Sequence, residues 1–386
     1  MKLFPFLSIL MAGAVTLTVS LESSPAASSK SKSKSTKKVA KPKPQPDPHL
    51  QLPPYKLGPD SEVQVKYPQG TVTSYTWYQS KVYPNTEREY WVYVPAQYNE
   101  AKPACVMVWQ DGAAAVQPKG ALRVPIVMDN LIATKKMPVT IGIFINPGRV
   151  THYKGADQPS NRSEEYDSVD GNYVKFLLDE ILPAVGRKYK LSDDPEKRLI
   201  AGGSSGGLCA FNVAWQRPDQ FRKVFTWNAS FTNIRGGNVF PELVKKEPKK
   251  PLRVYLLAAR NDLINQYGNW WEVNQYMISA LMEQEYDMEY MNGDGGHKAE
   301  HAGQILPDVL RWMWRDAEID MTPNPPVDVT KGPDKDGSKK KRKGDEDDSP
   351  KKRKGSEVEE EPTPPKKRKS SDEEPAKKKT AKPTNV

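Results

Sequence analysis

Cysteine and histidine are scarce in this 386-residue chain, which contains two and four of them, respectively. Two cysteines are too few for a scaffold held by disulfides or for a zinc site built from thiolates. Cys105 and Cys209 each lie in an apolar run, which favours small core residues, and the sequence leaves open whether they pair. We predict no metal site and no cofactor.

The middle of the chain lacks the positive charge that the whole chain carries, a formal net charge of +10. Residues 331–386 hold 19 Lys and Arg against 13 Asp and Glu, and residues 28–49 hold seven Lys against one Asp. The two tails therefore carry +6 each, which leaves −2 for the remainder. Because charge in such segments builds no folded basic surface, we predict no specific nucleic-acid partner.

The N-terminal residues 1–27 predict a cleaved secretory signal. Lys2 precedes an apolar stretch over residues 3–21, and small residues follow at Ser24 and Ala26, which is the pattern of a signal peptide and its cleavage site. Left uncleaved, the same stretch would anchor the chain to a membrane. In either case we expect export, so that the protein is secreted or periplasmic.

Two further segments have compositions that are typical of disorder. Residues 28–54 form a Lys/Pro/Ser linker, and residues 321–386 form a charged tail. Basic pentads at 350–354 and 365–369 match nuclear-localisation patterns, but an exported chain would not meet an import receptor. Contact between these basic tails and an anionic polymer or surface is the interpretation we favour.

Residues 55–320 alternate short apolar strands with helical patterns, which predicts one α/β domain with a mostly parallel central sheet and helices on both faces. The strand candidates are residues 72–77 and 90–94, as an antiparallel pair, then 104–109, 139–145, 198–201, 223–227, 253–258 and 288–291. The helix candidates are residues 173–189, 207–216, 270–284 and 303–315.

The strongest local motif is Gly-x-Ser-x-Gly around Ser204. The apolar strand ending at Ala201 runs directly into it, and an apolar helix with small residues follows. In a nucleophile elbow the serine occupies a strained strand-to-helix turn, and flanking glycines are required because a Cβ atom would clash there. Gly202 and Gly206 stand at the required spacing, so we predict Ser204 as a nucleophile.

A serine nucleophile needs a base, and two of the four histidines are poor candidates. His49 lies in the predicted linker, and His152 precedes Ser204, against the chain order Ser, Asp or Glu, His of this architecture. His297 follows a strand candidate in a glycine-rich loop. We predict His297 as the base, and His301 remains the alternative.

The orienting acid should fall between serine and histidine in the chain. Asp262 follows the apolar strand candidate 253–258 in a short loop, where a carboxylate can reach an imidazole and fix its tautomer. A helix N-cap is the competing explanation for such an aspartate, and Glu272 is the reserve candidate.

The negatively charged oxygen that forms when the serine attacks a carbonyl needs hydrogen-bond donors. We predict that these are the N–H of Ser205 together with that of Gly112 or Ala113, which follow an early strand.

Four motifs together resemble a known family. They are Gln110-Asp111-Gly112, Asn161-Arg162-Ser163 with Glu165-Tyr166, the segment 202–207, and Gly295-Gly296-His297. In combination they are similar to the α/β-hydrolase family named "Putative esterase", which includes enterochelin-esterase-like and esterase-D-like enzymes, feruloyl and acetylxylan esterases, and mycolyltransferases. The resemblance covers about residues 60–316 and is nearest to the enterochelin-esterase-like secreted branch. It implies an α/β-hydrolase fold with Ser204, His297 and Asp262 as the triad. Arg162 and Glu165 of the second motif could either shape the site or brace a loop, and we favour the loop brace.

The sequence thus predicts an exported serine esterase that cleaves a small-molecule or carbohydrate ester through an acyl-enzyme. An acyltransferase on the same fold is one alternative, and a non-catalytic scaffold that binds anionic polymer through its tails is another. The tryptophans at 77, 109, 270 and 271 are either core residues or a stacking wall for the substrate.

Overall fold

The computed structural model describes residues 47–152 and 158–327. The predicted signal at 1–27, most of the predicted linker and most of the predicted tail lie outside these ranges, so those predictions remain predictions. Among the described residues, no helix is both long enough and apolar enough to cross a bilayer.

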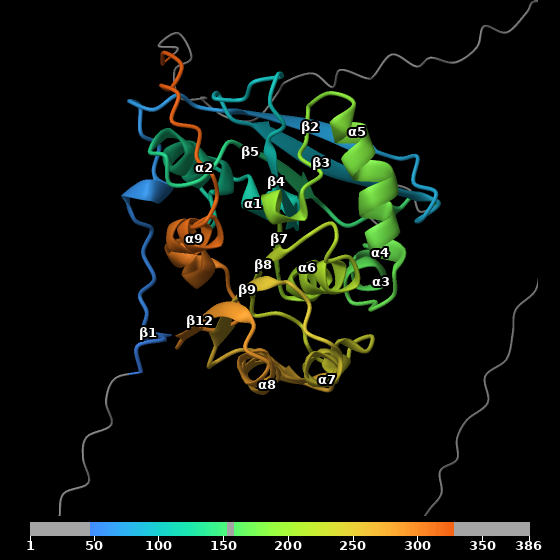
Figure 1. The fold of residues 1–386 in the computed structure, drawn as a ribbon. Helices are drawn as coiled ribbons and strands as arrows, with labels where there is room; N and C mark the ends of the chain where they lie inside the picture. Colours follow the sequence, from blue (N-terminus) through green and yellow to red (C-terminus); the bar gives the residue numbers. More distant parts are fainter. Residues whose placement is uncertain (1–46, 153–157, 328–386) are drawn as a thin grey trace, which may run out of the picture. The chain divides into compact units, whose positions relative to one another are not determined.

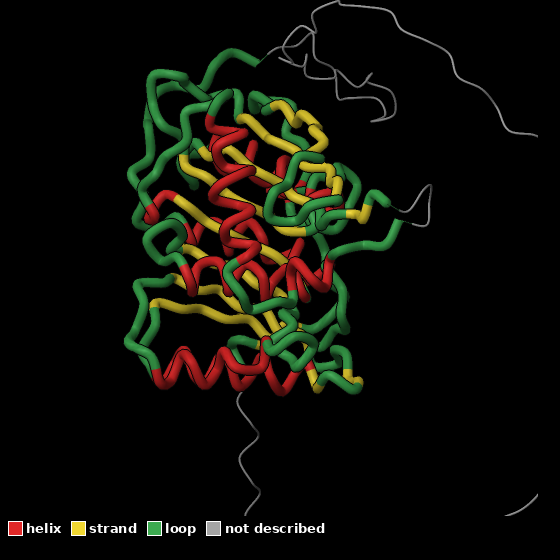
Figure 2. The backbone as a smooth tube through the Cα atoms, turned by 90° about the vertical axis from the view of Figure 1, so that its right-hand side faces the viewer, coloured by secondary structure: helices red, strands yellow, loops and turns green. Residues whose placement is uncertain are grey.

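Ten strands form one twisted sheet in the described chain, in the order β1, β12, β9, β8, β7, β4, β5, β3, β2, with β6 pairing to β3. The pairs from β1 through β5 are parallel, and β3 and β2 add an antiparallel edge. Figure 2 shows the strands stacked between helices. The strands are β1 (Leu50–Gln51), β2 (Thr71–Trp77), β3 (Thr86–Val94), β4 (Cys105–Gln110), β5 (Thr140–Ile145), β6 (Arg149–Val150), β7 (Arg198–Gly203), β8 (Lys223–Trp227), β9 (Arg253–Ala259) and β12 (Asp287–Gly293).

Helices cover both faces of the sheet (Figure 1). One face carries α1 (Gly112–Ala115), α2 (Val124–Ala133) and α9 (Glu300–Met313). The other face carries α3 (Arg162–Tyr166), α4 (Asn172–Lys175), the π-helical turn η3 (Phe176–Ile181), α5 (Leu182–Gly186), α6 (Ser205–Gln216), α7 (Phe240–Lys246) and α8 (Trp270–Glu283). Short 3₁₀ turns lie at η1 (Pro59–Ser61), η4 (Pro195–Lys197) and η5 (Gly237–Val239), and β10 (Ile264–Asn265) with β11 (Gly268–Asn269) forms a separate hairpin.

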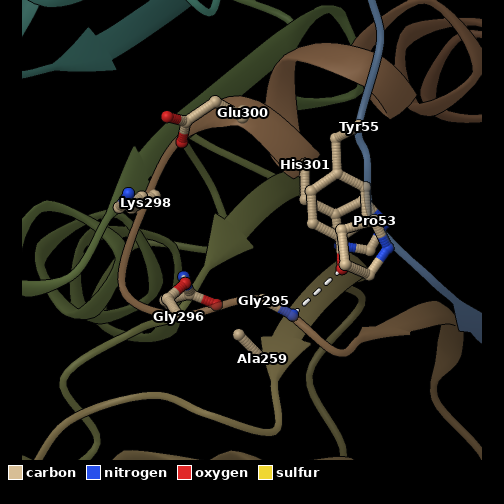
Figure 3. A pocket seen from close by; sticks show the side chains of 9 residues that line it. Pro53, Tyr55, Ala259, Gly295, Gly296, Lys298, Glu300 and His301 are labelled. Carbon is tan, nitrogen blue, oxygen red and sulfur yellow. Dashed lines mark hydrogen bonds between the residues drawn. The ribbon is translucent and has the colours of Figure 1, made fainter.

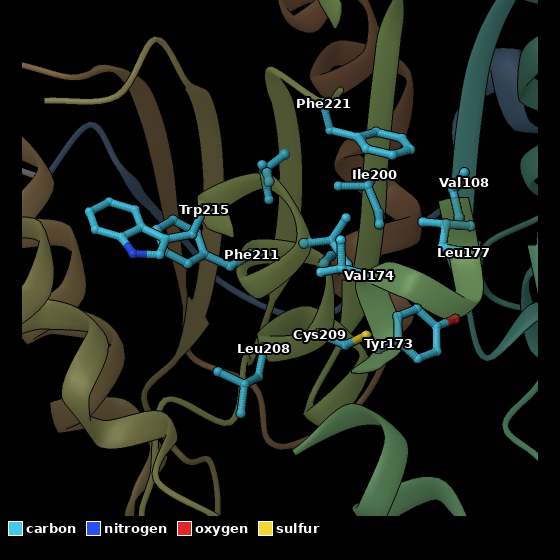
Figure 4. Close-up of a cluster of buried hydrophobic side chains, with 14 of the residues drawn as sticks. Val108, Tyr173, Val174, Leu177, Ile200, Leu208, Cys209, Phe211, Trp215 and Phe221 are labelled. Atoms are coloured by element: carbon cyan, nitrogen blue, oxygen red, sulfur yellow. The ribbon is translucent and has the colours of Figure 1, made fainter. Parts of the chain in front are cut away.

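The central strands are buried on both sides, because a parallel sheet between two helix layers has no face in water. Along β4, Val106 and Val108 point into one apolar cluster, while Met107 and Trp109 point into the other. Figure 4 shows part of the first cluster, in which side chains of α4, η3 and α6 pack on β4 and β7. This packing holds the carboxyl ends of the strands at one fixed edge.

The predicted architecture is confirmed. Each strand candidate overlaps one strand of the observed sheet. The antiparallel pair predicted at 72–77 and 90–94 is β2 with β3. The helix predicted at 173–189 is a succession of α4, η3 and α5 that ends at Gly186. Helices α1, α2, α3 and α7 were not predicted.

Both predicted domain boundaries need correction. Residues 47–54, predicted as linker, belong to the fold: Leu50 and Gln51 form β1, which pairs with the end of β12. At the other end, residues 321–327 were predicted as tail, but the Asn324 side chain donates to the Ala133 carbonyl at 2.9 Å. A backbone strand and a side-chain anchor therefore extend the domain beyond the predicted range 55–320.

Candidate active site

The three predicted triad residues meet at the carboxyl edge of the sheet. Ser204 follows β7, Asp262 lies beyond the end of β9, and His297 lies beyond the end of β12. His297 Nε2 is 2.8 Å from Ser204 Oγ, and His297 Nδ1 is 2.5 Å from Asp262 Oδ1. Residues up to 93 positions apart in sequence thus form one continuous hydrogen-bonded chain.

The backbone at Ser204 is strained in the way an elbow requires. Its φ is 56° and its ψ is −128°, a combination that costs a non-glycine residue roughly 1–3 kcal/mol. A Cβ atom on Gly202 would lie 2.3 Å from the Gly206 carbonyl oxygen, and one on Gly206 would lie 2.9 Å from the Gln110 side chain. The two glycines therefore let α6 begin directly against β7 and β4, with the Ser204 side chain held at the turn.

The Asp262 carboxylate fixes the orientation of the imidazole. Its side chain is 1% exposed, against 24% for that of His297, and its Oδ1 also accepts from the Leu263 N–H at 2.7 Å. Because a carboxylate accepts hydrogen bonds, we place the proton of the neutral imidazole on Nδ1. The lone pair of Nε2 then faces Ser204 Oγ and can accept the hydroxyl proton.

The loop that carries His297 is held by neighbours from three parts of the chain. Asn228 Nδ2 donates to the Gly296 carbonyl at 3.3 Å, and the Asn261 N–H donates to the Gly295 carbonyl at 3.0 Å. The Gly295 N–H donates to the Tyr55 hydroxyl at 3.1 Å, which is the dashed line in Figure 3. Tyr55, the first residue of the predicted domain, therefore contacts the histidine loop.

A cavity of about 290 Å³ lies between this segment and the histidine loop (Figure 3). Its lining includes Tyr55, Gly295, Gly296 and His301. The Tyr55 ring stacks on the His301 ring at a centroid distance of 4.1 Å. The cavity therefore adjoins the loop of His297, although its lining includes neither Ser204 nor His297.

His301, the alternative base, lies in different surroundings. Its Nε2 lies 3.0 Å from the Gln51 side-chain oxygen, and burial lowers its pKa to about 4. Its Nδ1 finds no partner within the described ranges. His49 is likewise occupied away from Ser204, with its ring stacked on Tyr290 at 4.2 Å.

The predicted oxyanion donors are only partly free to act. Within the described chain, the N–H groups of Ser205 and Gly112 stand in the first turns of α6 and α1 and have no acceptor. Ala113 was the other candidate, but its N–H donates to Asn146 Oδ1 at 2.9 Å. Because that bond occupies its only backbone donor, Ala113 is removed from the predicted set, and Gly112 remains with Ser205.

The motif residues Arg162 and Glu165 pair with different partners in different loops. Glu165 is buried and accepts from both terminal nitrogens of Arg88 and from the Gly148 N–H, which agrees with a loop brace. Arg162 forms a bidentate pair with Asp111, at 2.9 and 2.7 Å. Asp111 directly precedes Gly112, so this pair fixes the loop that carries the predicted oxyanion donor.

The four tryptophans do not form one stacking wall. Trp109 is fully buried among core aromatics, and the indole of Trp77 donates to Glu180. Trp270 is the one beside the triad: it is 2% exposed and meets the His297 ring edge to face at 6.2 Å.

Ser230 is a polar residue at the site that the sequence did not reveal. It follows β8 by three residues, is fully buried, and places its Oγ 3.3 Å from Ser204 Oγ. Its position after a strand, at the edge where the triad meets, is the signal that could have identified it.

Comparison with known proteins supports the predicted family. Residues 81–298 match the family model described as "Putative esterase". The iron(III) enterobactin esterase of Dickeya dadantii is 25% identical over 248 residues, which are 59% of this chain and 52% of that protein. An endo-1,4-β-xylanase/feruloyl esterase of Xylanibacter ruminicola is 27% identical over 143 residues, 37% of this chain and 17% of the relative. The matched region thus spans about half the length of the first relative and less than a fifth of the second.

Solved structures share the fold. The enterobactin esterase of Shigella flexneri in the presence of enterobactin superposes with a TM-score of 0.53 at 22% identity, over 65% of this chain and 60% of that one. A ferulic acid esterase gives a TM-score of 0.52 at 21% identity, over 64% of this chain and 99% of that one. The predicted α/β-hydrolase fold is confirmed. Since the family model matches more than half of its residues, the chain belongs to the "Putative esterase" family, a family of carboxylic ester hydrolases.

Proposed function

We propose that this protein is an exported serine esterase that hydrolyses carboxylic esters. The observation that carries the proposal is the chain of hydrogen bonds from Asp262 through His297 to Ser204, at 2.5 and 2.8 Å. A nucleophile, a base and an orienting acid within hydrogen-bond reach are what acyl transfer from an ester requires. The names of the relatives, enterobactin esterase and feruloyl esterase, support the ester as substrate class.

In the first half of the reaction, Ser204 Oγ attacks the ester carbonyl while its proton passes to His297 Nε2. The N–H groups of Ser205 and Gly112 donate to the carbonyl oxygen as it becomes negative. The imidazolium then protonates the departing alcohol oxygen, the carbon–oxygen bond of the ester breaks, and an acyl group remains on Ser204. Asp262 stays ionised throughout and stabilises the imidazolium.

In the second half, His297 takes a proton from water, and the hydroxide oxygen attacks the acyl carbon. His297 returns this proton to Ser204 Oγ as the acyl–oxygen bond breaks, which releases the acid and restores the enzyme. The substrate is proposed to be a small-molecule or carbohydrate ester. Export and contact of the basic tails with anionic polymer belong to the same proposal, and both rest on residues outside the described ranges.

The experiment compares Ser204→Ala with Ser74→Ala, a serine exposed on β2. With a short p-nitrophenyl ester, Ser204→Ala should lose roughly three or more decades of rate and all labelling by a fluorophosphonate. Ser74→Ala should match the unaltered chain in both. Full turnover in Ser204→Ala would remove the proposed mechanism.

A further inference from the structure

The Ser230 side chain places a second hydroxyl next to the oxygen of the proposed nucleophile, Ser204. Its Oγ is 3.3 Å from Ser204 Oγ, and the Trp270 indole nitrogen lies 3.2 Å from the same Ser230 oxygen. The Ser230 N–H also donates to the Ser204 carbonyl at 3.0 Å. Ser230 is fully buried and Trp270 is 2% exposed, so this contact lies within the packed wall of the site.

The direction of these hydrogen bonds follows from what each group can do. An indole N–H can only donate, so Trp270 donates to Ser230 Oγ. In the reactive arrangement, Ser204 donates its own proton to His297 Nε2, which leaves lone pairs on Ser204 Oγ. Among the described residues, Ser204 Oγ is the one acceptor within reach of the Ser230 proton. The Ser230 hydroxyl therefore donates to Ser204 Oγ.

We propose that Ser230 is a further catalytic residue, whose hydroxyl donates a hydrogen bond to Ser204 Oγ while that oxygen loses or regains its proton. The proposal rests on the proposed function of Ser204 as nucleophile. Ser230 keeps its proton throughout, and His297 remains the group that accepts and returns the proton of Ser204. No further reactant is needed.

The benefit arises because the charge on Ser204 Oγ changes during the reaction. A hydrogen bond to a charged acceptor is worth more than one to a neutral acceptor. At 3.3 Å the contact is long for two hydroxyl groups, so it is weak in the resting enzyme. It can shorten as negative charge builds on Oγ, and an interaction that strengthens in the transition state raises the rate.

Trp270 acts as a positioning residue for Ser230. Its indole N–H occupies one lone pair of Ser230 Oγ and so directs the hydroxyl proton toward Ser204. The same ring meets His297 edge to face at 6.2 Å. One buried tryptophan therefore contacts both groups that surround the nucleophile.

The experiment measures the attack of Ser204 without the later steps. The second-order rate of inactivation by a fluorophosphonate, and the single-turnover acylation rate with p-nitrophenyl acetate, both report this attack. Ser230→Ala should lower both rates about 10-fold to 100-fold, with little change in the half-saturating substrate concentration of the single-turnover reaction or in the unfolding temperature. Ser192→Ala removes another buried serine hydroxyl, at the opposite edge of the sheet, and should leave both rates unchanged.

Trp270→Phe provides a second variant, since it keeps an aromatic ring and removes the N–H donor. It should slow the attack less than Ser230→Ala, and it should add no further loss when combined with Ser230→Ala, because the Trp270 N–H acts on Ser204 only through the Ser230 hydroxyl. Wild-type rates in Ser230→Ala, or losses that multiply in the double variant, would overturn the role of Ser230. Either result beside an inactive Ser204→Ala would leave the proposed function intact, whereas an active Ser204→Ala would remove both.

Discussion

The N-terminal segment 47–57 offers a direct test of how the histidine loop is held. Two shortened chains differ only in their start, one at Asp47 and one at Tyr55, and both keep the family-matched residues 81–298. The shorter chain lacks β1 and retains the Tyr55 ring. We expect the chain that starts at Asp47 to match the full-length protein, and the chain that starts at Tyr55 to lose both stability and turnover.

The size of the loss follows from the bonds that β1 makes. The Asn292 N–H donates to the His49 carbonyl at 2.6 Å, and the Asp294 N–H donates to the Gln51 carbonyl at 3.2 Å. The Gln51 side-chain oxygen also bonds His301 and Gln304, at 3.0 and 3.1 Å. Four hydrogen bonds at about 0.5–1.5 kcal/mol each give a loss of about 2–6 kcal/mol. That is a large part of the 5–15 kcal/mol that stabilises a typical domain.

The assay is thermal unfolding together with turnover of a small neutral ester. A loss of this size should lower the Tm by roughly 5–20 °C for a domain of this length. Turnover should fall as well, measured below the Tm of the shorter chain, because Asn292 and Asp294 immediately precede the loop of His297. Equal Tm and equal kcat for the two chains would refute the reasoning and would make residues 47–54 a linker after all.

Three further predictions concern single residues. His297→Ala should lose roughly three or more decades of kcat on a p-nitrophenyl ester, whereas His301→Ala should keep most of its turnover and unfold at a lower temperature; the reverse pattern would show that the base is His301. Asp262→Asn should lose about 10³-fold to 10⁴-fold of kcat with little change in Tm, and near-normal kcat would reassign the acid. Burial raises the pKa of Asp129 to about 7. Between about pH 4 and 7 the folded chain therefore keeps a proton on Asp129 that the unfolded chain releases. The free energy of unfolding should fall as the pH rises through that window. Asp129→Asn should therefore gain about 2–4 kcal/mol relative to the unaltered chain between pH 5 and 8 in urea unfolding, and an equal pH dependence in both chains would contradict the buried carboxyl.

The nucleophile elbow could be predicted because its determinants are local. The clash that excludes a Cβ atom at Gly202 involves the carbonyl of Gly206, four residues away, so the constraint is visible as a short motif. His297 could be selected for a different reason, since histidine is scarce and the order of the triad along the chain is set by the architecture. Asp262 followed from its place after a strand, because parallel strands end at one edge of their sheet.

Other features could not be predicted because they depend on contacts between distant segments or lack a period. All ten residues of α2 are buried, so the helix has no polar face and shows no amphipathic pattern. The two residues of β1 lie in a segment rich in proline and glutamine, and they pair with residues about 240 positions away. Ala113 was an alternative to Gly112 because both lie in a loop of small residues after a strand, but a side chain 33 positions along the chain occupies its N–H.

Ser230 depends both on its local place after a strand and on a contact with a distant segment. This explains why a single serine after β8 can matter for a nucleophile that follows β7. The two strands are adjacent and parallel, with Gly203 in register with Trp227, so the residues that follow them emerge side by side. The Ser204 N–H donates to the Trp227 carbonyl, and the Ser230 N–H donates to the Ser204 carbonyl. The Ser204 backbone is thus hydrogen-bonded through both its N–H and its carbonyl to the segment that ends β8 and follows it, which fixes where the two serine side chains begin. For that reason we expect the effect of Ser230→Ala to appear in the rate of attack and not in substrate binding.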